Sequence, residues 1–571
     1  MTLIDPLTLE AASEDQLSLV SVPLDLPPVD QSLAAEHGEV FTRSWVVELI
    51  LDLCGYTPDK DLGSMTIVEP SCGSGAFLGP MVERLVASAQ IHHRDLNSCE
   101  SAIRASDLLD RNVELSRTRI QELLERLSSI SISRSQELAD AWVAQADFLL
   151  TPPHAGSADF VVGNPPYIRS EAIPSARNKA YRLACPTMGG RADIYIGFYE
   201  KGLRALKPHG ILGFICADRW MRNAYGSKLR KMISSRWSVE SIVHMTGVDA
   251  FEDEVDAYPS ITTIRRGPQE DGPLVVDACH DFGPSTTQEV VELNQDKNVG
   301  TKNEPTYSSA RLSTWFDGAG GWPTASPERL VLIADLETRF PNLEDERTGT
   351  KVGIGVATGA DKIFIVDGDP PGVEAERLLP LAMVRNIQDG SVNWGGKKLV
   401  NPWSQEGLVS TEDWPGMTAY LEPHKIALSD RHTAKSGKWH KTIDRVIEGL
   451  VDRPKLYLPD FKESIFPVLD EGGTYPHHNL YWVISDSWDL RVLGGLLLSD
   501  ISNMFIEAYS ARMSGGYLRF HAQYLRRICL PNISDVSSEA ASSLAEAFES
   551  RDRKAATQAA LPLYGLKVLP A

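Results

Sequence analysis

The chain has 571 residues, 42% of them hydrophobic and 23% charged, and carries a formal net charge of −21 at pH 7. This length exceeds one ordinary hydrophobic core, so we expect two or three domains. No apolar run reaches the ~20 residues of a membrane-spanning helix, and residues 1–29 lack the features of a signal peptide, so we expect a cytoplasmic protein without membrane contact. The seven scattered cysteines form no Cys-x-x-Cys pair, which argues against a disulfide framework or a zinc ribbon, and we expect no metal site.

Residues 1–36 are acidic and proline-dotted, which predicts an extended N-terminal arm. From residue 37 to 266, short apolar runs alternate with amphipathic segments, which predicts a doubly wound α/β domain. One helix is expected to pack Ile196, Tyr199, Leu203 and Leu206 on the sheet. The expected strands, of which the last two form a terminal hairpin, are 66–68, 103–106, 160–162, 211–216, 239–245 and 261–264.

The second half of the chain is less regular. Residues 267–345 are polar and rich in Gly, Pro, Asn and Thr, which predicts a linker or an elaboration of the first domain. A second domain of mixed α+β character is expected over residues 346–535. Residues 536–571 are alanine-rich at first and are expected to form a helical tail.

The first chemical motif runs from Val68 to Phe77 and contains Glu69, Ser71 and Gly73. An apolar strand ends in an acid and passes through a small-residue turn into a helix. Glycines allow a ligand to approach the backbone closely, and a helix N-terminus offers free N–H groups. The glycine spacing does not match a dinucleotide fingerprint, which favours S-adenosylmethionine over NAD as the cofactor.

Acids at the ends of the next strands extend this expected site. Asp107 can accept both hydroxyl groups of a ribose, with Asp110 as an alternative. At Asp147 and Phe148, a carboxylate can accept a hydrogen bond from an adenine amino group while the aromatic ring stacks on the base. Either signal is weak alone, but together they describe a nucleoside site.

The decisive motif is Asn164-Pro165-Pro166-Tyr167, directly after the strand Phe160 to Val162. Two prolines fix the backbone. The Asn164 side-chain oxygen and the Pro165 carbonyl can then hold the two hydrogens of an exocyclic amine and aim its lone pair at a methyl donor. Tyr167 is expected to stack on a base turned out of the duplex. The motif predicts methyl transfer to a planar amine.

These motifs, in this order, resemble the gamma-class N6-adenine DNA methyltransferases of bacterial restriction–modification systems, with likeness over nearly the whole chain from Gly38. The resemblance implies a seven-stranded Rossmann-like methyltransferase sheet followed by a target-recognition domain. It implies that Phe41 and Thr42 belong to a segment that closes over the cofactor, and that Tyr225 helps to clamp the flipped adenine. It also implies duplex DNA as partner, a monomer on DNA, and any restriction endonuclease or defence-system subunit as a separate polypeptide.

The net charge runs against DNA binding, because phosphate neutralisation supplies much of that affinity. Locally, however, residues 508–534 contain four arginines and no carboxylate. These arginines are candidates to contact phosphates or guanine edges: Arg512, Arg519, Arg526 and Arg527.

Two alternatives stay open at this point. One is a methyltransferase acting on another planar amine, such as an rRNA guanine or a protein glutamine, although the protein-methylating enzymes with this motif are much shorter. The other is a DNA-recognition subunit of a defence complex without activity of its own, which the intact motif at Asn164 to Tyr167 argues against.

Overall fold

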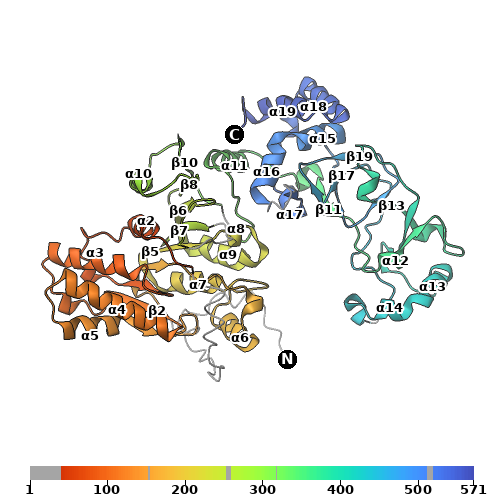
Figure 1. Cartoon of the computed structure of the whole chain (residues 1–571). Helices are drawn as coiled ribbons and strands as arrows, with labels where there is room; N and C mark the ends of the chain where they lie inside the picture. Colours follow the sequence, from red (N-terminus) through yellow and green to blue (C-terminus); the bar gives the residue numbers. More distant parts are fainter. Residues whose placement is uncertain are drawn as a thin grey trace, which may run out of the picture. The chain divides into compact units, whose positions relative to one another are not determined.

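The computed structural model describes residues 40–151, 155–252, 259–316, 318–436, 438–510 and 518–570. The predicted arm over residues 1–36 lies outside these ranges. The chain divides into two compact units, Met1–Ala334 and Asp335–Ala571, which are described separately (Figure 1). Within the described ranges, no helix combines the length and the apolar character that a membrane crossing requires.

The first unit is built on one mixed sheet that, within the described residues, has ten strands in the order β3-β2-β1-β4-β5-β7-β6-β8-β10-β9. Strands β3, β2, β1, β4 and β5 are parallel, and β7 runs antiparallel between β5 and β6. The strands are β1 Ile67–Glu69, β2 Ile103–Asp107, β3 Val143–Gln145, β4 Ala158–Gly163, β5 Leu206–Ala217, β6 Trp237–His244, β7 Pro259–Arg266, β8 Leu274–Ala278, β9 Lys302–Glu304 and β10 Tyr307–Arg311.

The first seven strands in this order form the predicted doubly wound sheet, including the antiparallel hairpin of β6 and β7. The sequence prediction of seven strands misses β8, β9 and β10, which extend the sheet beyond β6. All three come from residues 267–345, whose polar composition predicts a linker or an elaboration. The Leu-Val-Val run of β8 is fully buried against β6 and β10, so this segment is part of the folded unit.

Helices cover the sheet, and the apolar side chains of helices and strands together form the hydrophobic core of the unit. Three residues of the predicted helical face, Ile196, Tyr199 and Leu203, are fully buried on α7 beside β4 and β5. The fourth, Leu206, was assigned wrongly, because α7 ends at Ala205 and Leu206 is the first residue of β5. The described helices of this unit, with α11 passing into the second, are α2 Ser44–Cys54, α3 Leu78–Ile91, α4 Asp110–Leu127, α5 Ile132–Trp142, α6 Ser175–Ala184, α7 Tyr195–Ala205, α8 Arg219–Arg222, α9 Ser227–Arg236, α10 Pro284–Gln295 and α11 Pro327–Arg339.

The second unit is mixed α+β and has its own core. Its two larger described sheets have the strand orders β11-β21-β17-β19 and β12-β14-β13-β20. The strands are β11 Lys351–Ile354, β12 Ile365–Asp367, β13 Leu378–Ala382, β14 Lys397–Val400, β15 Trp403–Ser404, β16 Gly407–Leu408, β17 Lys455–Pro459, β18 Phe461–Lys462, β19 Val468–Asp470, β20 Tyr475–Pro476, β21 Leu480–Ile484 and β22 Leu518–Arg519.

The helices of the second unit gather mainly towards the end of the chain. The residues 536–571, predicted as a helical tail, form α18 and α19, and these pack on α15 (Figure 1). The helices are α12 Asp361–Phe364, α13 Pro415–Leu421, α14 Lys425–Ser429, α15 Leu490–Leu498, α16 Asp500–Tyr509, α17 Ala522–Leu525, α18 Ser538–Ser550 and α19 Arg553–Ala560.

Candidate active site

A cavity of about 950 Å³, counting its open mouth, lies at the carboxyl ends of β1, β2, β3 and β4. This edge is where ligands bind in open α/β sheets. The cavity brings together residues that are far apart in the sequence, including every predicted cofactor-binding residue. Its lining is Val40, Phe41, Thr42, Glu69, Pro70, Ser71, Cys72, Gly73, Ala76, Phe77, Asp107, Leu108, Leu109, Asn112, Ala146, Asp147, Phe148, Leu149, Asn164, Pro166, Ile168, Tyr181, Ile194 and Phe198.

The glycine loop after β1 is held in place by Asp107 at the end of β2. Gly73 has a φ of +52°, a conformation that side-chain-bearing residues rarely adopt. Its N–H donates to Asp107 Oδ2 at 2.9 Å. The other carboxylate oxygen, Oδ1, accepts from the Leu109 N–H at 2.9 Å and from Asn112 Nδ2 at 3.1 Å. Asp107 therefore braces the loop against the second strand as well as lining the cavity.

Glu69, the last residue of β1, is only 1% exposed. Its Oε2 atom is buried and has no hydrogen-bond partner among the described residues. Burial raises the pKa of Glu69 well above its usual range, the nearby charge of Asp107 raises it further, and Arg119 only partly opposes this shift. An unpartnered acid that faces a cavity is suited to a cationic ligand group.

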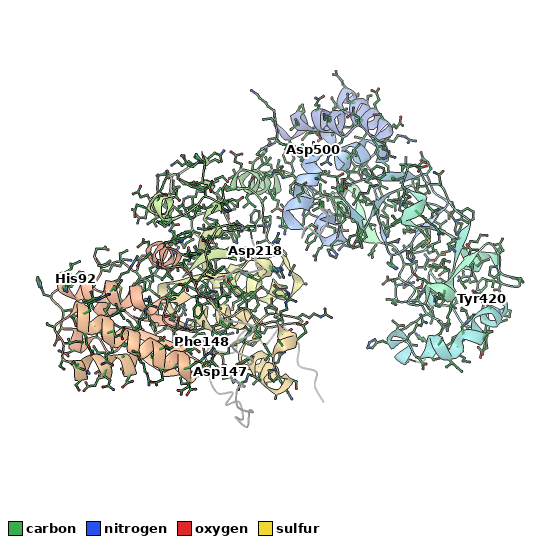
Figure 2. The ribbon with its side chains drawn as sticks, in the orientation of Figure 1. His92, Asp147, Phe148, Asp218, Tyr420 and Asp500 are labelled. Atoms are coloured by element: carbon green, nitrogen blue, oxygen red, sulfur yellow. The ribbon has the colours of Figure 1, made fainter. Side chains whose placement is uncertain are left out.

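Asp147 and Phe148, which Figure 2 labels on the first unit, form the third part of the lining. Asp147 Oδ2 accepts from Arg177 at 2.7 Å and from the Tyr181 hydroxyl at 2.9 Å, and both donors lie on α6. Phe148 stacks on Phe198 of α7, with ring centroids 5.5 Å apart and planes inclined by 21°. The cavity thus has an aromatic wall beside a fixed carboxylate.

The orientation of the Asn164 side chain, directly after β4, is fixed by an unambiguous partner. Its Nδ2 atom donates to the Val40 carbonyl oxygen at 3.0 Å and to Thr42 Oγ1 at 3.2 Å. Because a backbone carbonyl can only accept, the amide nitrogen must lie on that side. The amide oxygen, Oδ1, is buried without a hydrogen-bond partner among the described residues.

The other residues of the tetrapeptide are placed differently. Pro166 lines the cavity, whereas Pro165 and Tyr167 are not part of its lining. The Tyr167 hydroxyl points to the Ile215 carbonyl oxygen on β5, at 3.5 Å, and burial raises the pKa of Tyr167 well above its usual range. Tyr167 therefore lies on the β5 side of the tetrapeptide.

Tyr225, the predicted clamp of the target base, lies in the segment between α8 and α9. Its hydroxyl is 2.7 Å from the hydroxyl of Tyr195, at the start of α7. Burial raises the pKa of Tyr225 to about 12. Tyr225 is outside the lining of the cavity, so its predicted contact with a target base stays a prediction.

The predicted closing segment packs against the end of the α/β core. Thr42 forms an antiparallel bridge with Phe251, and the Glu252 N–H donates to the Phe41 carbonyl at 2.9 Å. Arg43 pairs with Asp249 at 2.8 Å. These contacts hold Phe41 and Thr42 over the glycine loop, where the nearest atom to a Cβ placed on Gly73 belongs to Phe41.

Comparison with known proteins decides the family. The family described as Eco57I restriction-modification methylase matches residues 51–251. The chain is 41% identical over 539 residues to the type II methyltransferase M.XhoI of Xanthomonas vasicola, which covers 93% of this chain and 97% of the relative. It is 42% identical over 536 residues to the type II methyltransferase M.PaeR7I of Pseudomonas aeruginosa, with 93% and 92% covered. The chain belongs to the type II methyltransferases.

The resemblance to restriction–modification methyltransferases is thereby confirmed, and so is the predicted fold of a methyltransferase sheet followed by a further domain. The same relationship extends to the type II methyltransferase M.BstVI of Geobacillus stearothermophilus, 37% identical over 516 residues, which cover 88% of this chain and 91% of the relative. In all three relatives the match spans both units, so the second unit belongs to the methyltransferase as much as the first.

Several residues of this methyltransferase site were not predicted from the sequence. Arg177 and Tyr181 reach Asp147 from α6, and Asn112 reaches Asp107 from α4. The aromatic wall is completed by Phe198. Arg177 and Tyr181 lie one helical turn apart, and this spacing indicates that both side chains point to the same side of a helix. Only the fold shows that the acid they contact is Asp147.

The predicted DNA-binding arginines lie in the second unit. Arg512 and the side chain of Arg519 are outside the described residues. Arg526 pairs with Glu344 at 3.1 Å and donates to the Val352 carbonyl, and Arg527 pairs with Glu337 while stacking on Tyr509. Both guanidinium groups thus have partners within the methyltransferase itself, and their contact with DNA stays a prediction.

Proposed function

We propose that this type II methyltransferase uses S-adenosylmethionine to methylate the N6 amine of an adenine turned out of duplex DNA. One observation carries the proposal: the Asn164 Oδ1 atom is buried and has no hydrogen-bond partner among the described residues. Its direction is fixed because the amide nitrogen of the same side chain donates to the Val40 carbonyl oxygen. An acceptor held in this way matches an amine that must present its hydrogens in a fixed direction.

The lining of the cavity fits S-adenosylmethionine. The unpartnered carboxylate of Glu69 suits the ammonium group of the methionine part, and Thr42 lies beside the same loop. Asp107 borders the place expected for the ribose, while Asp147 and the stacked Phe148 suit the adenine ring. When bound, this cofactor supplies an electrophilic methyl group on its sulfonium sulfur.

The residues of the chain then act on the target amine by orientation. The nitrogen lone pair of an aromatic amine is delocalised into the ring, which makes it a poor nucleophile. Asn164 Oδ1 and the Pro165 carbonyl oxygen each accept one hydrogen, so the nitrogen becomes more tetrahedral and its lone pair points into the cavity. Such fixed acceptors contribute to rate through positioning and electrostatics without a covalent intermediate.

The burial of Asn164 Oδ1 implies that the target base is flipped out of the duplex. An amine inside a stacked duplex cannot reach a buried oxygen, so the base has to leave the helix. We propose that Tyr167 and Tyr225 stack on the flipped base, and that the second unit reads the surrounding sequence. We expect a monomer on duplex DNA, and a restriction endonuclease or defence-system subunit as a separate chain.

The proposal is tested with isotopically labelled S-adenosylmethionine and unmodified bacterial genomic DNA, followed by mass spectrometry of the nucleosides. We expect N6-methyladenine from the wild type. Asn164→Ala should lower kcat by about 100-fold or more, as removal of one preorganised hydrogen-bonding group does in other enzymes. The matched control is Asn298→Ala, an exposed asparagine of the same unit, which should retain full activity.

Two results would contradict this proposal. Methylated cytosine instead of methylated adenine would remove the adenine specificity. Labelling of RNA or protein, with none in DNA, would move the substrate to another planar amine. Binding of S-adenosylhomocysteine, measured by calorimetry in parallel, separates a wrong substrate from a chain that does not bind the cofactor.

A further inference from the structure

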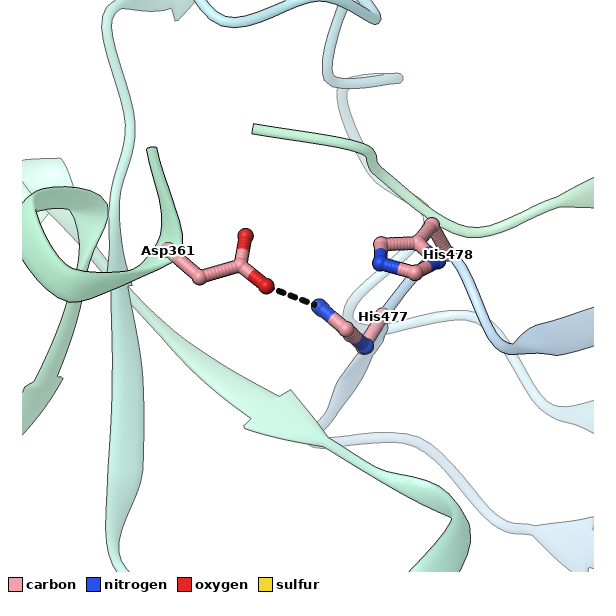
Figure 3. A group of neighbouring side chains, drawn as sticks. All are labelled: Asp361, His477 and His478. Carbon is pink, nitrogen blue, oxygen red and sulfur yellow. Dashed lines mark hydrogen bonds and ion pairs between the residues drawn. The ribbon is translucent and has the colours of Figure 1, made fainter. Parts of the chain in front are cut away.

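Three side chains with metal-binding atoms lie close together in the second unit, and none of them lines the cavity of the first unit. Asp361, His477 and His478 each offer one such atom, and these atoms all lie within 4.8 Å of one another (Figure 3). Asp361 and His477 are separated by 116 residues. Because of this separation, no metal-binding motif is recognisable in the sequence here.

The two histidines are held by a firmly hydrogen-bonded backbone. The His477 N–H donates to the Ala382 carbonyl at 2.9 Å, and the His478 N–H donates to the Val356 carbonyl at 3.1 Å. A Cβ placed on Gly355 would lie 2.2 Å from the His477 carbonyl oxygen, so this close approach of the two segments needs a glycine. The backbone positions of both histidines are therefore set by the fold.

The His477 ring is also oriented from behind. It is 3% exposed, and its Nδ1 atom lies 2.9 Å from Asn479 Oδ1. The amide oxygen can only accept, so Nδ1 is the donor of this contact and Nε2 is the ring nitrogen left to face Asp361. Histidine ligands of metals are usually fixed in this manner by a hydrogen bond to the second ring nitrogen.

The Nε2 atom of His477 faces a carboxylate. Asp361, the first residue of α12, directs Oδ2 at His477 Nε2 from 3.2 Å, and its Oδ1 accepts a short hydrogen bond from the Thr358 hydroxyl. Without a metal this contact is a hydrogen bond or an ion pair, and a metal ion bound to both atoms would replace it. Figure 3 shows the exposed His478 ring beside the same space, and the centroids of the two imidazoles are 4.1 Å apart.

We propose that Asp361, His477 and His478 bind a divalent transition-metal ion, with zinc as the first choice. Two imidazoles and one carboxylate suit Zn²⁺, Co²⁺ or Ni²⁺, whereas Mg²⁺ and Ca²⁺ prefer oxygen ligands throughout. Three protein ligands leave one position of a tetrahedral site for water. The ion ties the loop that contains Thr358 and the start of α12 to the segment between β20 and β21, and so stabilises the second unit.

The test uses full-length protein without a polyhistidine tag, stripped with EDTA and dialysed. Calorimetric titration with Zn²⁺ should show one ion per chain, and Co²⁺ should produce visible absorption bands of a coordinated ion. At a Zn²⁺ concentration 100 times Kd, we expect the melting temperature of the second unit to rise by about 5 °C. Methyl transfer is not measured, so the result is independent of the proposed function.

The variant His478→Gln removes one ligand from an exposed position and should leave the fold intact. We expect it to bind Zn²⁺ at least about tenfold more weakly, while His424→Gln, an exposed histidine of the same unit, binds like the wild type. A flat titration of the wild type would overturn the proposal and leave His477 and Asp361 as an imidazolium–carboxylate pair. Equal Zn²⁺ binding by the wild type and His478→Gln would overturn it as well.

Discussion

Glu69 combines a cost to folding with a proposed role in cofactor binding. Because its pKa is raised in the folded chain, folding favours the protonated acid. Its contribution to stability is therefore fully present below the pKa of the unfolded chain, about 4.3, and is lost as the pH rises towards the raised pKa of the folded chain. In the absence of cofactor, the buried acid makes the first unit less stable at neutral and alkaline pH.

We therefore predict that Glu69→Gln stabilises the cofactor-free protein at pH 8 by roughly 1 kcal/mol and has a smaller effect at pH 5. The same change should weaken binding of S-adenosylmethionine, because the amide cannot neutralise an ammonium group. Thermal denaturation at the two pH values and calorimetric titration with the cofactor measure both effects. A variant that is less stable than the wild type at pH 8 would contradict the explanation.

Tyr181 provides a second test at the level of single residues. Its hydroxyl donates to Asp147 Oδ2 at 2.9 Å beside Arg177, so both residues position the acid rather than contact the target. Tyr181→Phe should raise the KM for S-adenosylmethionine by about tenfold with little change in kcat, since a hydrogen bond to a charged group is worth about 1.5 kcal/mol or more.

The control for Tyr181→Phe is Tyr420→Phe in the second unit (Figure 2), whose hydroxyl donates to the Ile363 carbonyl at 2.9 Å. It removes a comparable hydrogen bond without touching the cavity, so its KM should equal that of the wild type. An equal fall in kcat for both variants, with KM unchanged, would assign Tyr181 a purely structural role.

At the level of elements, the sequence predicted the strands that lead into the candidate site residues. Strands β1 and β2 end in Glu69 and Asp107, Asn164 directly follows β4, and the three apolar runs are followed by turns of recognisable composition. Strand β3 was missed because only Val143 of its three residues is buried, which leaves no periodic signal. The short edge strand is defined by its pairing with β2, which the sequence does not display.

The extension formed by β8, β10 and α10 is joined to the rest of its unit by aromatic packing. Phe282 is 4% exposed, and its ring lies 6.0 Å from that of Trp45 on α2 and 6.3 Å from that of Tyr307 on β10. This packing depends on a few large side chains, so it is not apparent from the polar composition of residues 267–345 as a whole. The sequence alone therefore suggested a looser segment than the structure shows.

Phe282→Ala should destabilise the first unit by about 3 to 5 kcal/mol, the usual cost of removing a buried phenylalanine. Chemical denaturation measures the change. The matched control is Leu115→Ala on α4, where the leucine is 56% exposed and little stability should be lost. If both variants unfold at the same denaturant concentration, the extension is not coupled to the stability of the unit.

At the level of the whole molecule, the two units have separate hydrophobic cores. One described core runs from Val46 to Tyr307 and the other from Val356 to Ile484. All residues that line the cavity belong to the first unit, and the three proposed metal ligands belong to the second. The motifs and apolar runs predicted the fold of the first unit, whereas the second unit contains no strong motif and its fold could be assigned only as mixed α+β.

This separation predicts two calorimetric unfolding transitions that respond to different ligands. S-adenosylhomocysteine at 100 times its Kd should stabilise the first unit by about 2.7 kcal/mol and leave the other transition in place. Zn²⁺ should move only the transition of the second unit. A single transition that both ligands shift equally would mean that the two cores unfold as one cooperative body.

With the proposed adenine as target, the anchored amide of Asn164 would also discriminate against one form of chemical damage. Deamination converts adenine to hypoxanthine and replaces the amino group with a keto oxygen. That oxygen would meet the fixed Oδ1 atom with lone pair against lone pair, and the amide cannot turn round while Val40 and Thr42 hold its nitrogen. On this proposal a deaminated base, which has no amine to methylate, would also bind less well because of its polarity and not its size.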